Sequence, residues 1–126
     1  MQLTEIIKVV EGKVLNPTTN LNTDITGGCG ADLMSDVLAS ILQPDALLLS
    51  GLCNPQVVRT AQMAEARAIV LVRGKVPPPE TIELASQEGI PLISSPFGMF
   101  ELCGRLYRAG LPSLERNLQL PCECDE

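Results

Sequence analysis

Three short apolar runs, each followed by a segment with helical periodicity, restrict this sequence to few folds. The runs are ALLLSG at 46–51, AIVLVRG at 68–74 and IPLISS at 90–95. Apolar runs of this length, bounded by glycine or proline, are typical of strands that are buried on both faces. Strands that alternate with helices pair in parallel through helical crossovers. We therefore expect an α/β fold of three layers, with a small, mainly parallel sheet of four to five strands flanked by helices.

Apolar spacing and capping residues also predict where the helices lie. The expected helices cover residues 4–11, 31–42, 54–66, 78–89 and 96–110. Asn54 before Pro55 is a typical helix start, and Asp32 is expected to be the N-cap of the helix before it. KVLN at 13–16 is a possible short strand, and NPTTNLNT at 16–23 has the composition of turns.

The length of 126 residues predicts one domain. We expect it to cover residues 1–111, followed by a mobile tail at 112–126 that has no clear period. The start, MQLTEIIKVVEGK, shows no signal-peptide pattern, and PDALLLSGL is too short to span a bilayer. These features predict a cytoplasmic protein with no membrane contact.

Composition excludes several function classes. The net charge is −6 and aromatic residues make up 2% of the chain, so neither phosphate contacts nor base stacking favours nucleic-acid binding. The sequence contains no histidine, which rules out a Ser-His-Asp or Cys-His arrangement within the chain. The five cysteines are odd in number and irregularly spaced, which favours reduced thiols over a disulfide framework. The sequence shows no pair of carboxylates whose spacing would indicate acid–base catalysis.

The expected strand ends provide a candidate binding site. In open parallel sheets, ligands bind outside the carboxyl ends of the strands. Here those ends read TGGCGAD, SGLCNP, RGKVPPP and SSPFG. The rim that they would form consists of Thr26, Gly27, Gly28, Ser50, Asn54, Arg73, Ser94 and Ser95. Helix caps and turns need the same residue types, and composition alone favours that plainer explanation.

The glycine-rich stretch at 27–34 matches no phosphate-binding motif. It lacks the lysine of a P-loop, and the only Gly-Lys pairs, Gly12-Lys13 and Gly74-Lys75, precede valine. The dinucleotide spacing fails as well, because Leu33 stands where a third glycine is needed. Neither ATP hydrolysis nor dinucleotide redox chemistry is therefore expected. The sequence also predicts no cofactor.

The cysteines suggest little chemistry. Cys29 lies before the expected helix start, where the dipole can create a reactive thiolate, but a small residue in a tight turn explains it better. Cys53 is placed similarly. Cys103 is expected on the apolar face of the last helix, in the protein core. Cys122 and Cys124 alone cannot complete a tetrahedral zinc site, so no metal is expected.

The pentapeptide DITGG at 24–28, followed by a helix, resembles the DRTGG domain. The resemblance extends through GGCGADLMSDVLA, LLLSGLCNPQVVRTAQMAEARAIVLVRGK and TIELASQEGIPLISS, and covers most of residues 3–111. It implies a domain similar to the N-terminal, non-catalytic domain of HPr kinase/phosphorylase, which also occurs beside CBS pairs in some pyrophosphatases. Asp24, Thr26, Gly27 and Gly28 match the motif. Ile25 replaces its arginine, so a role for a cation at this position does not carry over.

Together these observations predict a non-catalytic regulatory or ligand-sensing domain, expected to be a homodimer. Its ligand would be a small anionic metabolite or nucleotide, held by backbone amides around residues 26–32. The candidate residues are those of the rim together with Asp24, Cys29 and Asp32. Two alternatives stay open. One is a module that dimerises or docks on a metabolic or signalling protein, which an exposed face on the 99–107 helix would favour. The other is an enzyme that uses Cys29 or transfers phosphoryl groups, for which no partner base is present.

Overall fold

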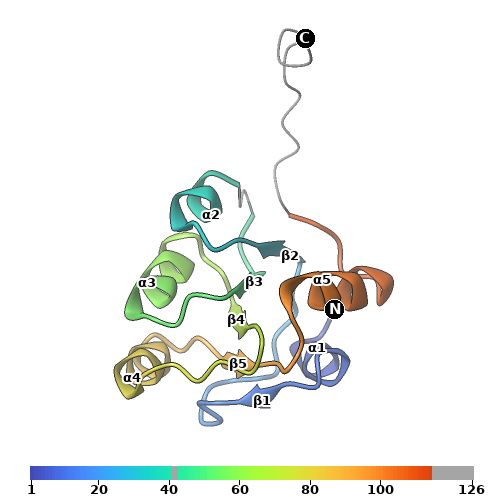
Figure 1. The fold of residues 1–126 in the computed structure, drawn as a ribbon. Helices are drawn as coiled ribbons and strands as arrows, with labels where there is room; N and C mark the ends of the chain where they lie inside the picture. The colour runs from blue at the N-terminus through green and yellow to red at the C-terminus, as the bar shows by residue number, and fades with distance from the viewer. Residues whose placement is uncertain (41–42, 115–126) are drawn as a thin grey trace, which may run out of the picture.

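The computed structural model describes residues 1–40 and 43–114, and Figure 1 shows a sheet with helices on both faces. The sheet has five strands in the order β1-β5-β4-β3-β2. Pairing is parallel from β2 through β5, and β1 joins β5 antiparallel. The strands are β1 (Lys13–Val14), β2 (Gly27–Gly30), β3 (Ala46–Ser50), β4 (Ala68–Leu71) and β5 (Leu92–Ser94).

The helices complete the three layers. They are α1 (Leu3–Val9), α2 (Met34–Ser40), α3 (Pro55–Met63), α4 (Pro79–Gln87) and α5 (Met99–Arg108). In Figure 1, α2, α3 and α4 cover one face of the sheet, while α1 and α5 cover the other. The predicted α/β fold with a mainly parallel sheet is therefore confirmed. No helix in the described ranges has the length and apolar character needed to cross a bilayer.

The central strands supply the core of both faces. Every residue of β3 and β4 is buried, as the continuous apolar runs indicate. Side chains alternate along a strand, so Leu48 packs among α2, α3 and α4, while Leu47 and Leu49 pack on the α1 and α5 side. The sheet is thus covered on both faces, as parallel sheets require.

The glycine-rich stretch is a strand, and its interpretation as a tight turn is wrong. Gly27–Gly30 pairs with Ala46–Leu49 as the edge strand β2. The glycines make room for neighbouring segments. A Cβ on Gly28 would lie 3.2 Å from Leu111 Cδ2, and one on Gly30 would lie 3.1 Å from Met99 Sδ. Close packing on the α5 side, rather than a need for turn dihedrals, explains these two residues.

Residues 112–114, which open the expected tail, lie along the outer side of β2. The Gly28 amide donates to the Pro112 carbonyl at 2.9 Å, and the Leu114 amide donates to the Gly28 carbonyl at 3.0 Å. Gly28 and Ser113 form a parallel bridge. This contact satisfies part of an otherwise open sheet edge. The rest of the expected tail, residues 115–126, falls outside the described residues.

Helix α2 begins later than predicted, and Asp32 is not its N-cap. The first helical amides, of Asp36 and Val37, donate to the Leu33 carbonyl, so Leu33 holds the N-cap position. The spacing of apolar residues over 31–42 predicts one apolar stripe of six residues: Leu33, Met34, Val37, Leu38, Ile41 and Leu42. Met34 and Val37 are buried, but Leu33 and Leu38 are exposed. The other two residues of that stripe, Ile41 and Leu42, fall outside the described residues.

Candidate functional site

The carboxyl ends of β2, β3 and β4 surround a cleft of about 440 Å³. The cleft also receives the first residue of α5. Its lining consists of Gly30, Ala31, Asp32, Gly51, Val72, Arg73, Lys75 and Met99. This is the edge of an open parallel sheet at which ligands bind. We refer to it as the strand-end cleft.

Asp32 is held in the strand-end cleft by the loop that follows β3. Its Oδ1 accepts hydrogen bonds from the Gly51 amide at 2.7 Å and from Ser50 Oγ at 3.3 Å. Ser50 Oγ in turn accepts a bond from the Leu52 amide at 3.2 Å. The predicted residues Asp32 and Ser50 therefore come together, with Asp32 oriented by its neighbours.

Lys75 is the cleft residue that sequence reasoning missed. Its Nζ donates to the Gly51 carbonyl at 2.8 Å, and its own carbonyl accepts a bond from Ser94 Oγ at 3.0 Å. These bonds hold the ammonium group beside the ends of β2 and β3. The signal was present in the sequence, because Lys75 follows an expected strand at the same edge as Arg73. The Gly74-Lys75 pair does not form a P-loop, so motif matching alone does not identify Lys75.

Arg73 supplies a second cation to the cleft. Its backbone is in the left-handed region with φ of 60°, and its amide donates to the Phe97 carbonyl at 2.7 Å. A Cβ on Gly98, the N-cap of α5, would lie 3.8 Å from Arg73 Nε, which places the side chain near that helix start. Within residues 1–40 and 43–114, no carboxylate pairs with Arg73 or Lys75 within 4.0 Å.

Ser95 and Asn54 have structural roles at this edge. Ser95 is buried, and its Oγ donates to the Val10 carbonyl at 2.8 Å while accepting a bond from the Phe97 amide. Asn54 is the N-cap of α3 and Pro55 its first residue, which confirms the predicted start. Neither residue lines the strand-end cleft.

The structure separates Asp24, Thr26 and Gly27 from the cleft. Gly27 pairs with Ala46, so it begins β2 at the amino edge of the sheet, opposite the strand ends. Thr26 Oγ1 donates to the Pro44 carbonyl at 2.9 Å at that edge. Asp24 pairs with the amino group of Met1 at 3.2 Å. The expectation of a shared rim is wrong for Thr26 and Gly27, because the stretch after Thr26 is a strand, and the further candidate Asp24 also lies apart from the cleft.

Three of the backbone amides expected to form a cradle are bonded within the protein. The amides of Thr26, Gly28 and Ala31 donate to the carbonyls of Asp45, Pro112 and Leu49. These amides satisfy the sheet and its edge. A ligand at the strand-end cleft would therefore depend on side chains more than on the glycine-rich backbone.

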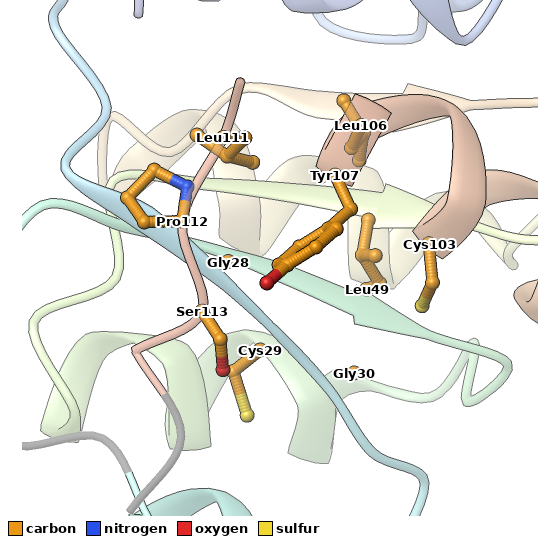
Figure 2. Close-up of a pocket in the computed structure, with 10 residues that line it drawn as sticks. All are labelled: Gly28, Cys29, Gly30, Leu49, Cys103, Leu106, Tyr107, Leu111, Pro112 and Ser113. Carbon is orange, nitrogen blue, oxygen red and sulfur yellow. The ribbon is translucent and has the colours of Figure 1, made fainter. Parts of the chain in front are cut away.

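The glycine motif borders a different and smaller cavity. Figure 2 shows this pocket between β2, α5 and residues 111–113, with Gly28 and Gly30 on its floor. Its volume is about 100 Å³, and leucine and tyrosine side chains contribute to its walls. Sites for drug-sized ligands have volumes of about 300–1,000 Å³. The strand-end cleft is of this size, and the pocket is too small for a nucleotide.

Two cysteine predictions are corrected by the structure. Cys29 lies within β2 rather than before a helix start, and it is 2% exposed in the core beside α2. A helix dipole therefore does not activate it. Cys103 was expected in the core but is exposed on α5. Cys122 and Cys124 lie outside the described residues.

Cys53, which lies between β3 and α3, is unsuited to nucleophilic chemistry at neutral pH. Burial raises the pKa of the Cys53 thiol above its usual value, and the nearby positive charge of Lys75 opposes this only in part. The raised pKa keeps the thiol protonated, and the thiolate is the reactive form. The thiol is half-buried and lies 3.8 Å from the Gly51 carbonyl.

We predict that iodoacetamide modifies Cys53 slowly at neutral pH, with a rate that keeps rising through about pH 9 because the pKa is raised. Lys75→Met removes the charge that lowers this pKa and should slow the reaction further. Peptide mass spectrometry across a pH series measures the rate, with exposed Cys103 as the internal reference. Faster modification of Cys53 than of Cys103 at neutral pH would contradict the prediction.

Searches for relatives place the fold rather than the family. No protein-family model matches the chain, and no curated protein matches it. Among solved structures, the fold is similar to the CBS and DRTGG domains of the regulatory region of a Clostridium perfringens pyrophosphatase, complexed with the activator diadenosine tetraphosphate. The two chains are 15% identical with a TM-score of 0.64, and the match covers 95% of this chain but 52% of the other.

The chain thus spans about half the length of the solved structure that it matches. The described residues contain no group of three or more side chains that could hold a metal ion. The shared architecture fits the DRTGG-like domain that the sequence resemblance implies.

Proposed function

We propose that this chain is a non-catalytic regulatory or ligand-sensing domain that binds a small anionic metabolite or nucleotide in the strand-end cleft. The observation that carries the proposal is the pair of cations, Arg73 and Lys75, beside a cleft of about 440 Å³. No carboxylate of the described residues forms an ion pair with either cation, and two such cations at one site favour an anion in a chain whose net charge is −6. An arginine and a lysine suit phosphate oxygens, through forked and point-charge contacts respectively.

Other observations support a nucleotide as the ligand class. Asp32 presents a fixed carboxylate in the same cleft, and a carboxylate can accept bonds from a ribose hydroxyl or a base amine. A regulatory region that shares this fold is complexed with diadenosine tetraphosphate. A sensing role without catalysis is consistent with the absence of histidine from the sequence and with the raised pKa of Cys53. The expected cytoplasmic homodimer remains part of this proposal.

A thermal-shift titration tests the ligand site. Nucleoside triphosphates, diadenosine tetraphosphate and acyl phosphates are added to the full chain, and a ligand at a hundred times its Kd should stabilise the fold by about 2.7 kcal/mol. Arg73→Ala and Lys75→Ala should each weaken binding about tenfold or more, since each removes a charged contact.

Arg59→Ala is the matched control, because Arg59 is exposed on α3 and its loss changes the net charge equally. It should leave the ligand-induced shift as it is in the unchanged protein. Two results would contradict the proposal. One is a folded protein that none of these anions stabilises, and the other is an equal loss in the Arg59 variant.

A second function, as a docking or dimerisation module for a metabolic or signalling protein, is favoured by a separate observation. Phe100 and Tyr107 on α5 are 94% and 73% exposed, on the helix where the sequence suggested a contact face. Exposed aromatic residues on one helix are typical of protein contacts. The two functions are compatible, because Phe100 and Tyr107 do not line the strand-end cleft.

A further inference from the structure

Helix α5 carries an exposed apolar stripe, and one side of this stripe borders β2. Leu102 and Leu106 are the buried residues of α5 and do not belong to this stripe. Phe100 and Tyr107, with Cys103 and Gly104 between them, are exposed at spacings of three and four residues, which places all four on one face. A Cβ on Gly104 would meet no atom within 4 Å. Figure 2 shows Cys103 and Tyr107 on this helix at the edge of the small pocket. We call these four residues the α5 stripe.

We propose that the α5 stripe is the contact surface for a second copy of this chain, with the two helices packed antiparallel. The stripe runs from a large residue through two small ones to a large one. Reversing one copy therefore places Phe100 against the partner's Tyr107, and Cys103 against the partner's Gly104. The small central residues allow the helices to approach closely. Such a surface matches itself, as a twofold interface requires.

The charges beside the stripe match the same arrangement. Glu101 and Arg108 are exposed and seven residues apart, so both lie on one flank of α5. A twofold axis across antiparallel helices brings the same flank of each copy together in opposite directions. Glu101, which also accepts a bond from Arg105 Nε at 2.8 Å within its own helix, then lies beside the partner's Arg108, and this pairing occurs twice.

The size of the stripe predicts a weak dimer. Two phenylalanines and two tyrosines, each burying about 150–250 Å², give roughly 600–1,000 Å² in total. This is at or below the lower end for specific interfaces, so association should depend on concentration. The inference rests on the proposed homodimer and specifies its interface. It is independent of the proposed ligand site, and the two are tested by different measurements.

Sedimentation equilibrium of the full chain over a concentration series tests the interface. We expect a monomer–dimer equilibrium that Gly104→Arg weakens by at least about tenfold, because a long charged side chain enters the centre of the contact. The open space at Gly104 allows the variant to fold. Met63→Arg, at an exposed methionine on α3, is the control and should leave the equilibrium unchanged.

Exchanging the two charges provides a second test, which does not depend on introducing a larger side chain into the interface. Glu101→Arg and Arg108→Glu should each weaken the dimer, and the double variant should restore it, since the opposite charges then face each other again. A monomer at every concentration, a dimer that Gly104→Arg leaves intact, or a double variant without rescue would each overturn the proposal. Ligand-induced thermal shifts in the Gly104→Arg variant measure ligand binding at the strand-end cleft separately from dimer formation.

Discussion

Replacing Asn16 with alanine is expected to lower the free energy of unfolding by about 2–5 kcal/mol, since two buried backbone groups lose their partners. Asn16 is 3% exposed. Its Nδ2 donates to the Ile90 carbonyl and its Oδ1 accepts from the Leu92 amide, both at 2.8 Å. The side chain continues the pairing of β1 with β5 beyond the last β1 residue. Without it, the start of β5 retains a buried donor and a buried acceptor.

Urea denaturation measures this change, and Asn20→Ala is the control. Asn20 is exposed, and its Oδ1 accepts a single bond from the Asn22 amide at 3.0 Å. Its substitution should change stability by no more than about 0.5 kcal/mol. If Asn16→Ala proves as mild as the Asn20 variant, the structural role assigned to the Asn16 amide is wrong.

Gly27→Ala is expected to destabilise the fold by about 1–3 kcal/mol through overpacking at the edge strand. The new Cβ would lie 2.5 Å from Leu114 Cγ and 2.7 Å from the Pro112 carbonyl oxygen. That oxygen accepts the bond from the Gly28 amide, so it cannot move without releasing residues 112–114 from β2. The Gly28 amide should then lose protection from hydrogen exchange.

The same substitution at Gly104 has the opposite expected sign. Gly104 lies within α5 with open space around it, so alanine should stabilise the monomer by about 0.5–1 kcal/mol. Both variants are measured by urea denaturation in dilute solution, where dimer formation does not contribute. Equal effects at the two positions would show that packing of residues 112–114 on β2 is not what fixes Gly27.

The strands that could be predicted from the sequence are those whose own residues form a continuous apolar run. Leu47, Leu48 and Leu49 of β3 are buried on both faces, and a continuous apolar run reports this directly. Strand β2 could not be found in this way. Glycine has low strand propensity, and Gly27 and Gly28 are explained by contacts with residues more than eighty positions later in the chain.

The candidate site was predictable only in part for the same reason. Ser50 and Arg73 follow clear strands, and their shared edge follows from parallel pairing. A turn at residues 27–30 would place Thr26 at that edge, but because these residues form β2, Thr26 lies at the opposite edge. Ile25, the changed residue of the DRTGG-like motif, is 1% exposed and packs in the core beside α1 and α5. In this chain the motif lies at the edge of the sheet where the parallel strands begin.

The most direct test of the central claim, that the strand-end cleft is the ligand site, is a backbone amide NMR titration. The ligand is the nucleotide or acyl phosphate that gives the largest thermal stabilisation. We predict saturable shifts at Asp32, Gly51, Arg73 and Lys75, the residues around the cleft, with little change at residues 24–28. Saturable shifts centred on residues 24–28 would contradict this account and return the site to the glycine motif.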